Sequence, residues 1–252
     1  MSDAICSLID HRQQYDALRN TLADTGNQHS VFWFEAHCDD WPEMLARHLL
    51  LEPWPNDLSC LQRFVSGRMP ACDAERILDG WCEQLSLSRI AQRVDRLNAL
   101  HQWLNQAPLT VFYTELMPEN WTRLPDYLRG AHQAVAHLGG LNVGVHVVVL
   151  FACISSCRPS LLPSLLWRFH YRRRARKLSE AHALHGMYRL KKEDISDWLT
   201  GFPSELRQQY DHGRLKSEIF DQVFRQRDDP VRFGEVRRHL IDQQGLVRAR
   251  KG

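Results

Sequence analysis

The sequence predicts an α/β protein in which a parallel sheet carries helices on both faces. Three runs rich in β-branched and aromatic residues carry this prediction: 31–34, 109–113 and 143–154. Stretches with helical periodicity separate the three runs, as expected when parallel strands are joined by crossover helices. The third run is apolar on both of its faces, which is typical of a central parallel strand.

The first third of the chain predicts a helix, a strand and a second helix. A helical stripe covers 9–22, and Val31–Phe34 is the first strand. The second helix begins at Asp40, whose side chain can cap it. Pro42 suits the first turn, and Glu43 stands three residues after the cap, where a capping box places an acid.

The middle of the chain predicts long helices around the second strand. Helical periodicity runs through 73–107 and again through 121–138, where Gly139-Gly140 ends it. Earlier, the prolines on both sides of Trp54 stop any helix and are compatible with a short edge strand.

The last third changes character and predicts a separate helical unit. Short apolar stripes at helical spacing follow one another, and Ile219–Phe224 is the clearest of them. The only strand pattern there is Met187–Leu190. We therefore expect an α/β domain over 1–190 and a C-terminal helical subdomain over 191–252.

Composition excludes several classes of protein. Hydrophobic residues make up 44% of the chain and charged residues 25%, which predicts a globular protein rather than a disordered one. The net charge of +2 gives no global attraction to nucleic acid or membrane. No signal peptide precedes the first helix, no apolar stretch reaches the roughly 20 residues of a membrane span, and the seven cysteines are scattered, so we expect a cytoplasmic protein with free thiols.

The turn after the first strand stands where a P-loop protein would bind phosphate. Such a loop needs glycines for a tight backbone wrap, a lysine for the phosphates and a serine or threonine for magnesium. Here the turn reads His37-Cys38-Asp39-Asp40 and contains none of these residues. Its two carboxylates satisfy the helix N-terminus and repel a triphosphate. The sequence thus predicts a degenerate P-loop NTPase-like fold with no cofactor and no metal.

The second strand ends on an acid, Glu115. In an active NTPase an acid at this position helps to hold magnesium or to orient water. Any strand also needs a polar residue where it emerges, so Glu115 is predicted to be the remnant of a second-strand acid.

The order of these motifs resembles that of the inactive STAND domains, which are NTPase modules of signalling proteins that have lost their Walker motifs. The resemblance covers about 30 to 245 and rests on His11–Gln14, Val31–Glu35, Asp40–Leu50, Trp54, Val111–Glu115, Val143–Phe151 and Asp194–Leu199. It implies a signal-transmitting or scaffold module of prokaryotic conflict and antiviral systems, without catalytic residues. We expect the chain to carry no effector domain of its own, in which case a separately encoded partner would supply the output.

A basic segment follows the third strand. Six cations lie within ten positions, interleaved with aromatic residues: Arg168, Arg172, Arg173, Arg174, Arg176 and Lys177. Such a segment suits a single-stranded nucleic acid or another anionic partner. A solvated helix face and an acidic surface of a protein partner remain open as alternatives.

Together these features predict a non-catalytic module that acts through protein partners, with no role at the membrane. Two alternatives remain open: a nucleic-acid-binding protein that uses the basic segment, and an unorthodox NTPase or a nuclease built on Glu115. The sequence does not predict an oligomeric state.

Overall fold

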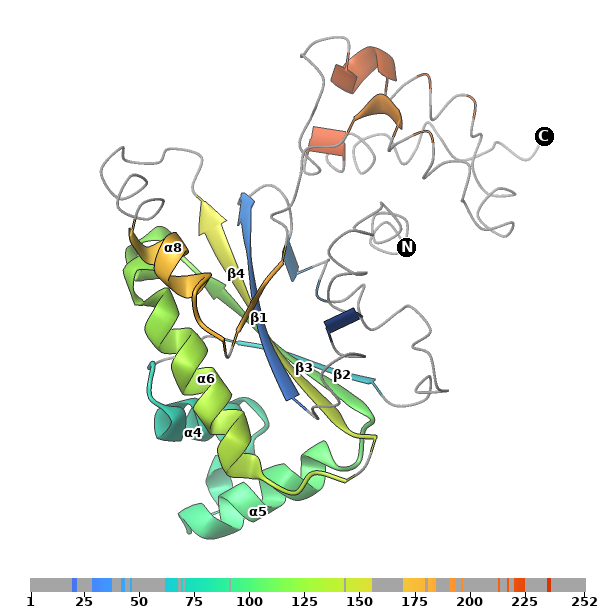
Figure 1. The fold of residues 1–252 in the computed structure, drawn as a ribbon. Coiled ribbons are helices and arrows are strands. Elements are labelled where there is room, and N and C mark those ends of the chain that lie inside the picture. The colour runs from blue at the N-terminus through green and yellow to red at the C-terminus, as the bar shows by residue number, and fades with distance from the viewer. Residues whose placement is uncertain are drawn as a thin grey trace, which may run out of the picture.

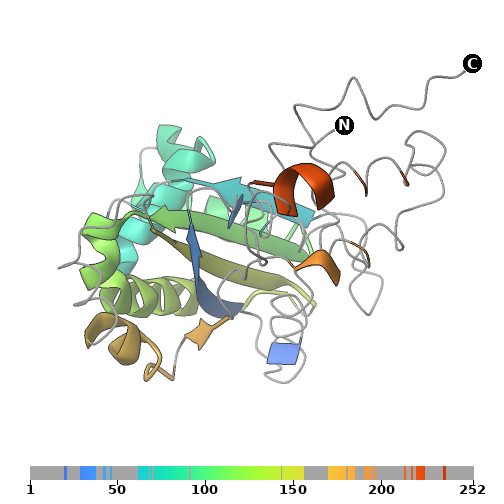
Figure 2. The ribbon, with the colours of Figure 1, turned by 90° about the horizontal axis from the view of Figure 1, so that it is seen from above.

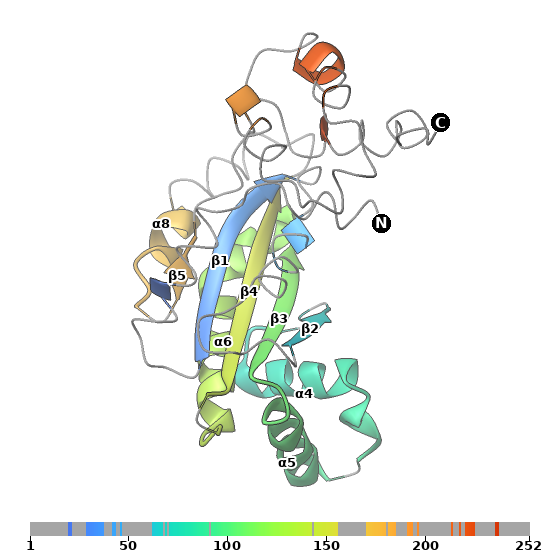
Figure 3. The same cartoon turned by 90° about the vertical axis from the view of Figure 1, so that its right-hand side faces the viewer.

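A five-stranded, entirely parallel sheet forms the core of the protein (Figure 1). The computed structural model describes residues 20–21, 29–37, 42–43, 46, 62–67, 69, 71–90, 92–142, 144–155, 170–179, 181–184, 191–193, 196, 213, 217, 220–224 and 235–236. The strands are β1 (His29–His37), β2 (Gln62–Ser66), β3 (Leu109–Leu116), β4 (His146–Ser155) and β5 (His182–Ala183). Their order across the sheet is β2-β3-β4-β1-β5. Figure 3 shows the strands side by side in this order.

The three strands predicted from the sequence are confirmed as β1, β3 and β4. β1 and β4 pair along their whole lengths, from His29 opposite Val147 to His37 opposite Ser155. Residues between the ends of β4 are buried on both sides, as its apolar sequence predicts for a central parallel strand.

The two edge strands were not predicted. β2 contains only two apolar residues, Phe64 and Val65, and is recognisable through its pairing with β3. β5 is only two residues long and pairs with Phe32 and Trp33. The edge strand expected around Trp54 and the strand pattern Met187–Leu190 lie outside the described residues.

One side of the sheet is covered by helices from three crossovers. These are α4 (Ala74–Gln84), the short 3₁₀ helix η2 (Leu87–Arg89), α5 (Arg93–Leu104), the 3₁₀ helix η3 (Pro118–Arg123), α6 (Leu124–Leu138) and α8 (Arg172–Ala175). Figures 1 and 2 show α6 and α8 on this side. On the same side, Trp81 of α4 stacks on Phe112 of β3 with ring centroids 4.1 Å apart.

The prediction of unbroken helix over 73–107 was wrong. Asp73 caps the start of α4 by accepting a hydrogen bond from the backbone N–H of Arg76. The helix then ends because Ser86 adopts a left-handed conformation with φ 58°, and its N–H bonds back to the carbonyl of Glu83. Apolar periodicity alone did not reveal this turn, since apolar residues continue through it.

The opposite face of the sheet is also buried. Phe32 and Phe34 of β1 and Tyr113 of β3 form a second apolar cluster there. Ala46 belongs to this cluster and is helical, as are Pro42 and Glu43 before it. The helix expected to begin at Asp40 is thus present in its described residues, and helices contribute to both faces.

The strand order explains why the first crossover lies on the other side. The chain passes from β1 across β4 and β3 to β2, and then returns through β3 and β4 towards β5. Because crossovers between parallel strands are right-handed, this reversal places the first crossover helix opposite the others. The reversal also creates a topological switch point between the carboxyl ends of β1 and β4, where α/β sheets bind their ligands.

Beyond β5 the described residues are mostly helical. They include Lys192, Ser196 and a π-helical turn over Phe220–Phe224, whose Val223 is buried. The boundary expected near residue 190 lies outside the described residues, so the division into two domains stays a prediction. Within the part of the chain that the structure describes, no helix combines the length and apolarity that a bilayer span requires.

Candidate functional site

The switch point brings together the carboxyl ends of β1 and β4. His37 closes β1 opposite Ser155, and the Ser155 hydroxyl donates a 3.1 Å hydrogen bond to the carbonyl of Ala36. This bond fixes the two strand ends to each other. The degenerate phosphate loop begins at His37; its next residues, Cys38, Asp39 and Asp40, lie outside the described residues.

The first crossover helix covers one face of the sheet, which we call the first-crossover face. On this face, carboxylates border the switch point. Glu115, the predicted second-strand acid, is exposed near the end of β3. It accepts a 2.9 Å hydrogen bond from the hydroxyl of Tyr113 on the same strand. Glu43, from the first crossover helix, also acts on this hydroxyl electrostatically.

Tyr113 is a neutral donor in this cluster. Burial raises the pKa of its hydroxyl far above the ordinary value, and the negative charges of Glu115 and Glu43 raise the pKa further. The phenol therefore keeps its proton and its bond to Glu115 at physiological pH. The charged groups that act on Tyr113 are both negative, which is unfavourable for a phosphate.

These acids do not form a metal centre within the described ranges. No group of three or more histidine, cysteine, aspartate or glutamate side chains is assembled among the residues from 20 to 236 that the structure describes. Glu43 and Glu115 are two carboxylates beside a phenol, and such a pair does not enclose a metal ion in a cage made of protein ligands alone.

The other face of β1 carries an ion pair to the basic segment. Glu35 follows Val31 and Trp33 on the face that α6 and α8 cover, and its Oε1 lies 2.7 Å from Nε of Arg172 on α8. The buried thiol of Cys153 lies opposite Glu35 in the β1–β4 register. Burial raises the pKa of this thiol well above normal, and the charge of Glu35 adds to the increase. Cys153 is therefore an unreactive core thiol.

The rest of the basic segment faces solvent. Arg173, Arg174, Arg176 and Lys177 are exposed, and we call these four residues the α8 basic surface. None of the ion pairs formed by described residues includes them. Ala175, between them, is fully buried and holds α8 against the molecule. Arg168 lies outside the described residues.

Sequence reasoning found Glu115 and the basic segment but not their partners. Glu35 had a signal, since it is an acid within the apolar run of β1. Glu43 was interpreted as a capping-box acid, and its proximity to Tyr113 depends on how the first crossover packs. A cavity between α4 and α6 had no signal in the sequence, because its walls come from two separate crossovers.

Comparison with known proteins supports the fold alone. No protein-family model and no curated protein sequence matches the chain. In structure, the ORC2 protein of Aeropyrum pernix in its ADPNP–ADP complexes is similar, with a TM-score of 0.52 and 13% identity over 94% of this chain. This chain spans 64% of the length of that protein. Cdc6p from Pyrobaculum aerophilum has a TM-score of 0.45 and 15% identity, over 94% of this chain and 63% of its own. The ORC2 similarity and the parallel strand order together show that the chain has a P-loop NTPase-like α/β fold.

Proposed function

We propose that this chain is a non-catalytic module that has lost nucleotide binding in the usual mode and organises or transmits a signal between protein partners. The observation that carries the proposal is the acidic border of the switch point. Glu43 and Glu115 both act on Tyr113 there. The residues that follow β1 include two more acids, Asp39 and Asp40. There is no glycine or lysine between His37 and the first crossover helix.

The fold by itself does not exclude a nucleotide. The Aeropyrum pernix protein of similar fold has been obtained with ADPNP and ADP. In this chain the side chains disfavour a nucleotide, because the carboxylates of Asp39 and Asp40 would repel a phosphate and would take its place at the N–H groups of the helix N-terminus. A large, well-packed fold without phosphate chemistry favours a role in assembly over one in catalysis.

The resemblance to inactive STAND domains supplies the biological setting of the proposal. Such a module would act in a prokaryotic defence or signalling system, with a sensor or effector encoded separately. Its partner would be a protein, and the α8 basic surface would contact an acidic surface of that protein.

Thermal melting with nucleotides tests the loss of binding. The full chain would be melted alone and with ATP, ADP or ADPNP, each with Mg²⁺ at constant ionic strength. A ligand at 100 times its dissociation constant adds about 2.7 kcal/mol to the free energy of unfolding. We expect no shift in midpoint, whereas a saturable shift with any of the three would refute the proposal.

Crosslinking in native cells tests the role in assembly. We expect protein partners to be recovered with the wild type and fewer with an Arg173→Glu/Arg174→Glu variant. Recovery of no protein, under conditions in which the folded chain is present, would count against a scaffold role.

A second candidate function is nucleic-acid binding through the α8 basic surface. It is favoured by four exposed cations within five positions, none of them in an ion pair among the described residues. Phosphate contacts make affinity fall with salt, with a slope of about 0.7–0.9 per contact. We expect Arg174→Glu to weaken single-stranded DNA binding and to reduce this slope.

Arg89→Glu is the matched control for this test. It makes the same charge change at an exposed residue of η2. If Arg174→Glu and Arg89→Glu have equal effects, the binding depends on overall charge, and the α8 basic surface is not a nucleic-acid site.

A further inference from the structure

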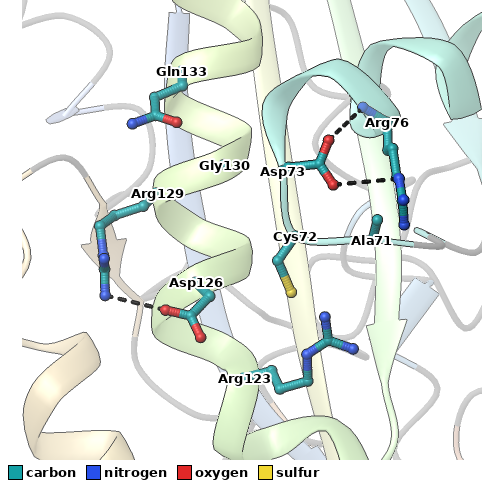
Figure 4. A pocket seen from close by; sticks show the side chains of 9 residues that line it. All are labelled: Ala71, Cys72, Asp73, Arg76, Arg123, Asp126, Arg129, Gly130 and Gln133. Atoms are coloured by element: carbon teal, nitrogen blue, oxygen red, sulfur yellow. Dashed lines mark hydrogen bonds and ion pairs between the residues drawn. The ribbon is translucent and has the colours of Figure 1, made fainter.

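A cavity of about 600 Å³ lies where the segment before α4 packs against the start of α6 (Figure 4). One wall is the segment Ala71–Asp73 with Arg76 on the first turn of α4. The other wall is Arg123, the last residue of η3, with residues of the first turns of α6. The volume lies within the range of small-molecule sites, which is about 300–1,000 Å³.

The walls of this cavity carry three arginines and two aspartates. Each aspartate is engaged by an arginine three residues along its own helix. Asp73 lies 3.7 Å from Nε of Arg76 and also caps α4, and Asp126 lies 3.1 Å from Arg129. Figure 4 shows both pairs, one on each side of the cavity.

Arg123 is the cation without a carboxylate. No ion pair among the described residues includes it. Its guanidinium lies 5.5 Å from the ring centre of Tyr127 and interacts with the thiol of Cys72 across the cavity. The wall therefore has one more positive charge than it has negative charges.

The other two groups beside Arg123 do not balance its charge. Burial raises the pKa of the Cys72 thiol above its ordinary value, although Arg123 partly opposes this rise. Burial also raises the pKa of Tyr127. Both groups stay neutral at physiological pH, so they can donate hydrogen bonds but leave the positive charge of Arg123 uncompensated.

The cavity is built by packed elements on both sides. A Cβ added at Gly130 would lie 1.8 Å from the carbonyl oxygen of Cys72, so the segment before α4 rests directly on α6. On the Arg123 side, the indole N–H of Trp121 donates a 3.1 Å hydrogen bond to the carbonyl of Leu116, which fixes η3 to the end of β3. Arg123 is thus presented by backbone that is held in place.

From this geometry we infer that the cavity between α4 and α6 binds a small organic anion through Arg123. The ligand would carry one phosphate or carboxylate group, because a guanidinium matches both groups with two parallel hydrogen bonds. The Cys72 thiol, which also lines the cavity, would donate a further bond to it. This site lies among the helices of the later crossovers, so it is independent of the switch point and of the proposed loss of nucleotide binding.

Titration with inorganic phosphate and, separately, with succinate tests the inference. The full chain would be titrated at constant ionic strength in chloride, with binding followed by calorimetry. We expect at least one of the two anions to bind at millimolar concentration or below, and the comparison distinguishes a phosphate from a carboxylate ligand. If neither anion binds at millimolar concentration, the inference is wrong.

Three variants attribute the binding to Arg123. Arg123→Gln should weaken it at least tenfold, and Arg123→Lys should weaken it less, because lysine keeps the charge but loses the planar fork. Arg89→Gln, a matched loss of one exposed charge on η2, should bind like the wild type. Equal affinities of Arg123→Gln and Arg89→Gln, with unchanged melting temperatures in chloride, would overturn the assignment. If Arg123→Gln does not fold, an Arg123→Lys variant with wild-type affinity would overturn it instead.

Discussion

The two faces of the sheet carry opposite charges near its carboxyl edge, and they hold these charges in different ways. On the first-crossover face, Glu115 belongs to the long strand β3 and is bonded to Tyr113 two residues before it. On the other face, the cations stand on α8, a helix of four residues, and on the turn that follows it; the buried Ala175 and the pair Arg172–Glu35 help to attach this segment.

This difference shows that the acidic site is part of the sheet, whereas the basic surface is attached through a short segment, by Ala175, by the flanking Tyr171 and Leu178 and by one ion pair. β3 pairs with β2 as far as Tyr113 and with β4 as far as Leu116, so the backbone of Glu115 is held in the sheet. The attachment of α8 includes an ion pair in which both side chains are about one third exposed, 34% for Arg172 and 33% for Glu35. Such a pair is partly screened by salt, so the position of the basic surface is expected to respond to ionic strength.

The largest effect on stability is expected from Tyr113→Ala, which removes the side chain that accompanies Glu115 on the first-crossover face. Tyr113 is 2% exposed and its ring stacks on Phe64, so truncation leaves a cavity in the core. We expect the free energy of unfolding in urea to fall by about 3–5 kcal/mol. Tyr113→Phe is the control: it removes only the hydroxyl bond to Glu115, which contributes about 1 kcal/mol. A loss below about 1 kcal/mol for the alanine variant would show that this side is not fixed by the core.

An intermediate effect is expected from Ala175→Asp, which buries a carboxylate without a partner beneath α8. We expect a loss of about 1–3 kcal/mol and faster cleavage by trypsin after Arg173 and Arg174, because the helix detaches from the sheet. Lys177→Asp places the same residue on the exposed side of this segment and should change stability by less than about 0.5 kcal/mol. Equal cleavage rates for the two variants would mean that Ala175 does not anchor α8.

The smallest effect concerns the ion pair between Glu35 and Arg172. A double-mutant cycle with Glu35→Gln and Arg172→Gln should give a coupling free energy of about 0.2–1 kcal/mol, since both side chains are partly solvated. The coupling should decrease as salt is added. A coupling that is well above this range and does not change with salt would place the pair in a dry interior, and the contrast between the two faces would disappear.

Long, strongly patterned elements were predictable, and short ones were not. The apolar runs at 31–34 and 143–154 each carry enough β-forming residues to be recognised without tertiary context. β2 and β5 exist because a neighbouring strand offers hydrogen bonds, and their own composition gives little sign of it. The turn at Ser86 was missed because a single left-handed residue interrupts a region whose apolar spacing continues.

The candidate sites divide in the same way. Glu115 was expected from its position at the end of a strand, and the basic segment from its composition. The pairing of Arg172 with Glu35 depends on α8 docking beside β1, and the closeness of Glu43 to Tyr113 depends on where the first crossover helix lies. Neither distance is contained in the local sequence, because the partners are separated by long stretches of chain.

By itself, the sequence determined the parallel α/β class and the absence of glycine and lysine in the turn after the first strand. These are properties of local composition and of hydrophobic periodicity, which any fold of this chain must satisfy. Tertiary structure alone decided that Glu43 and Glu115 both act on Tyr113 on one face, that the α8 basic surface lies on the other, and that Arg123 meets Cys72 across a cavity. The reason is that strand order and crossover handedness bring distant segments together, and only this juxtaposition decides which charges remain without a partner.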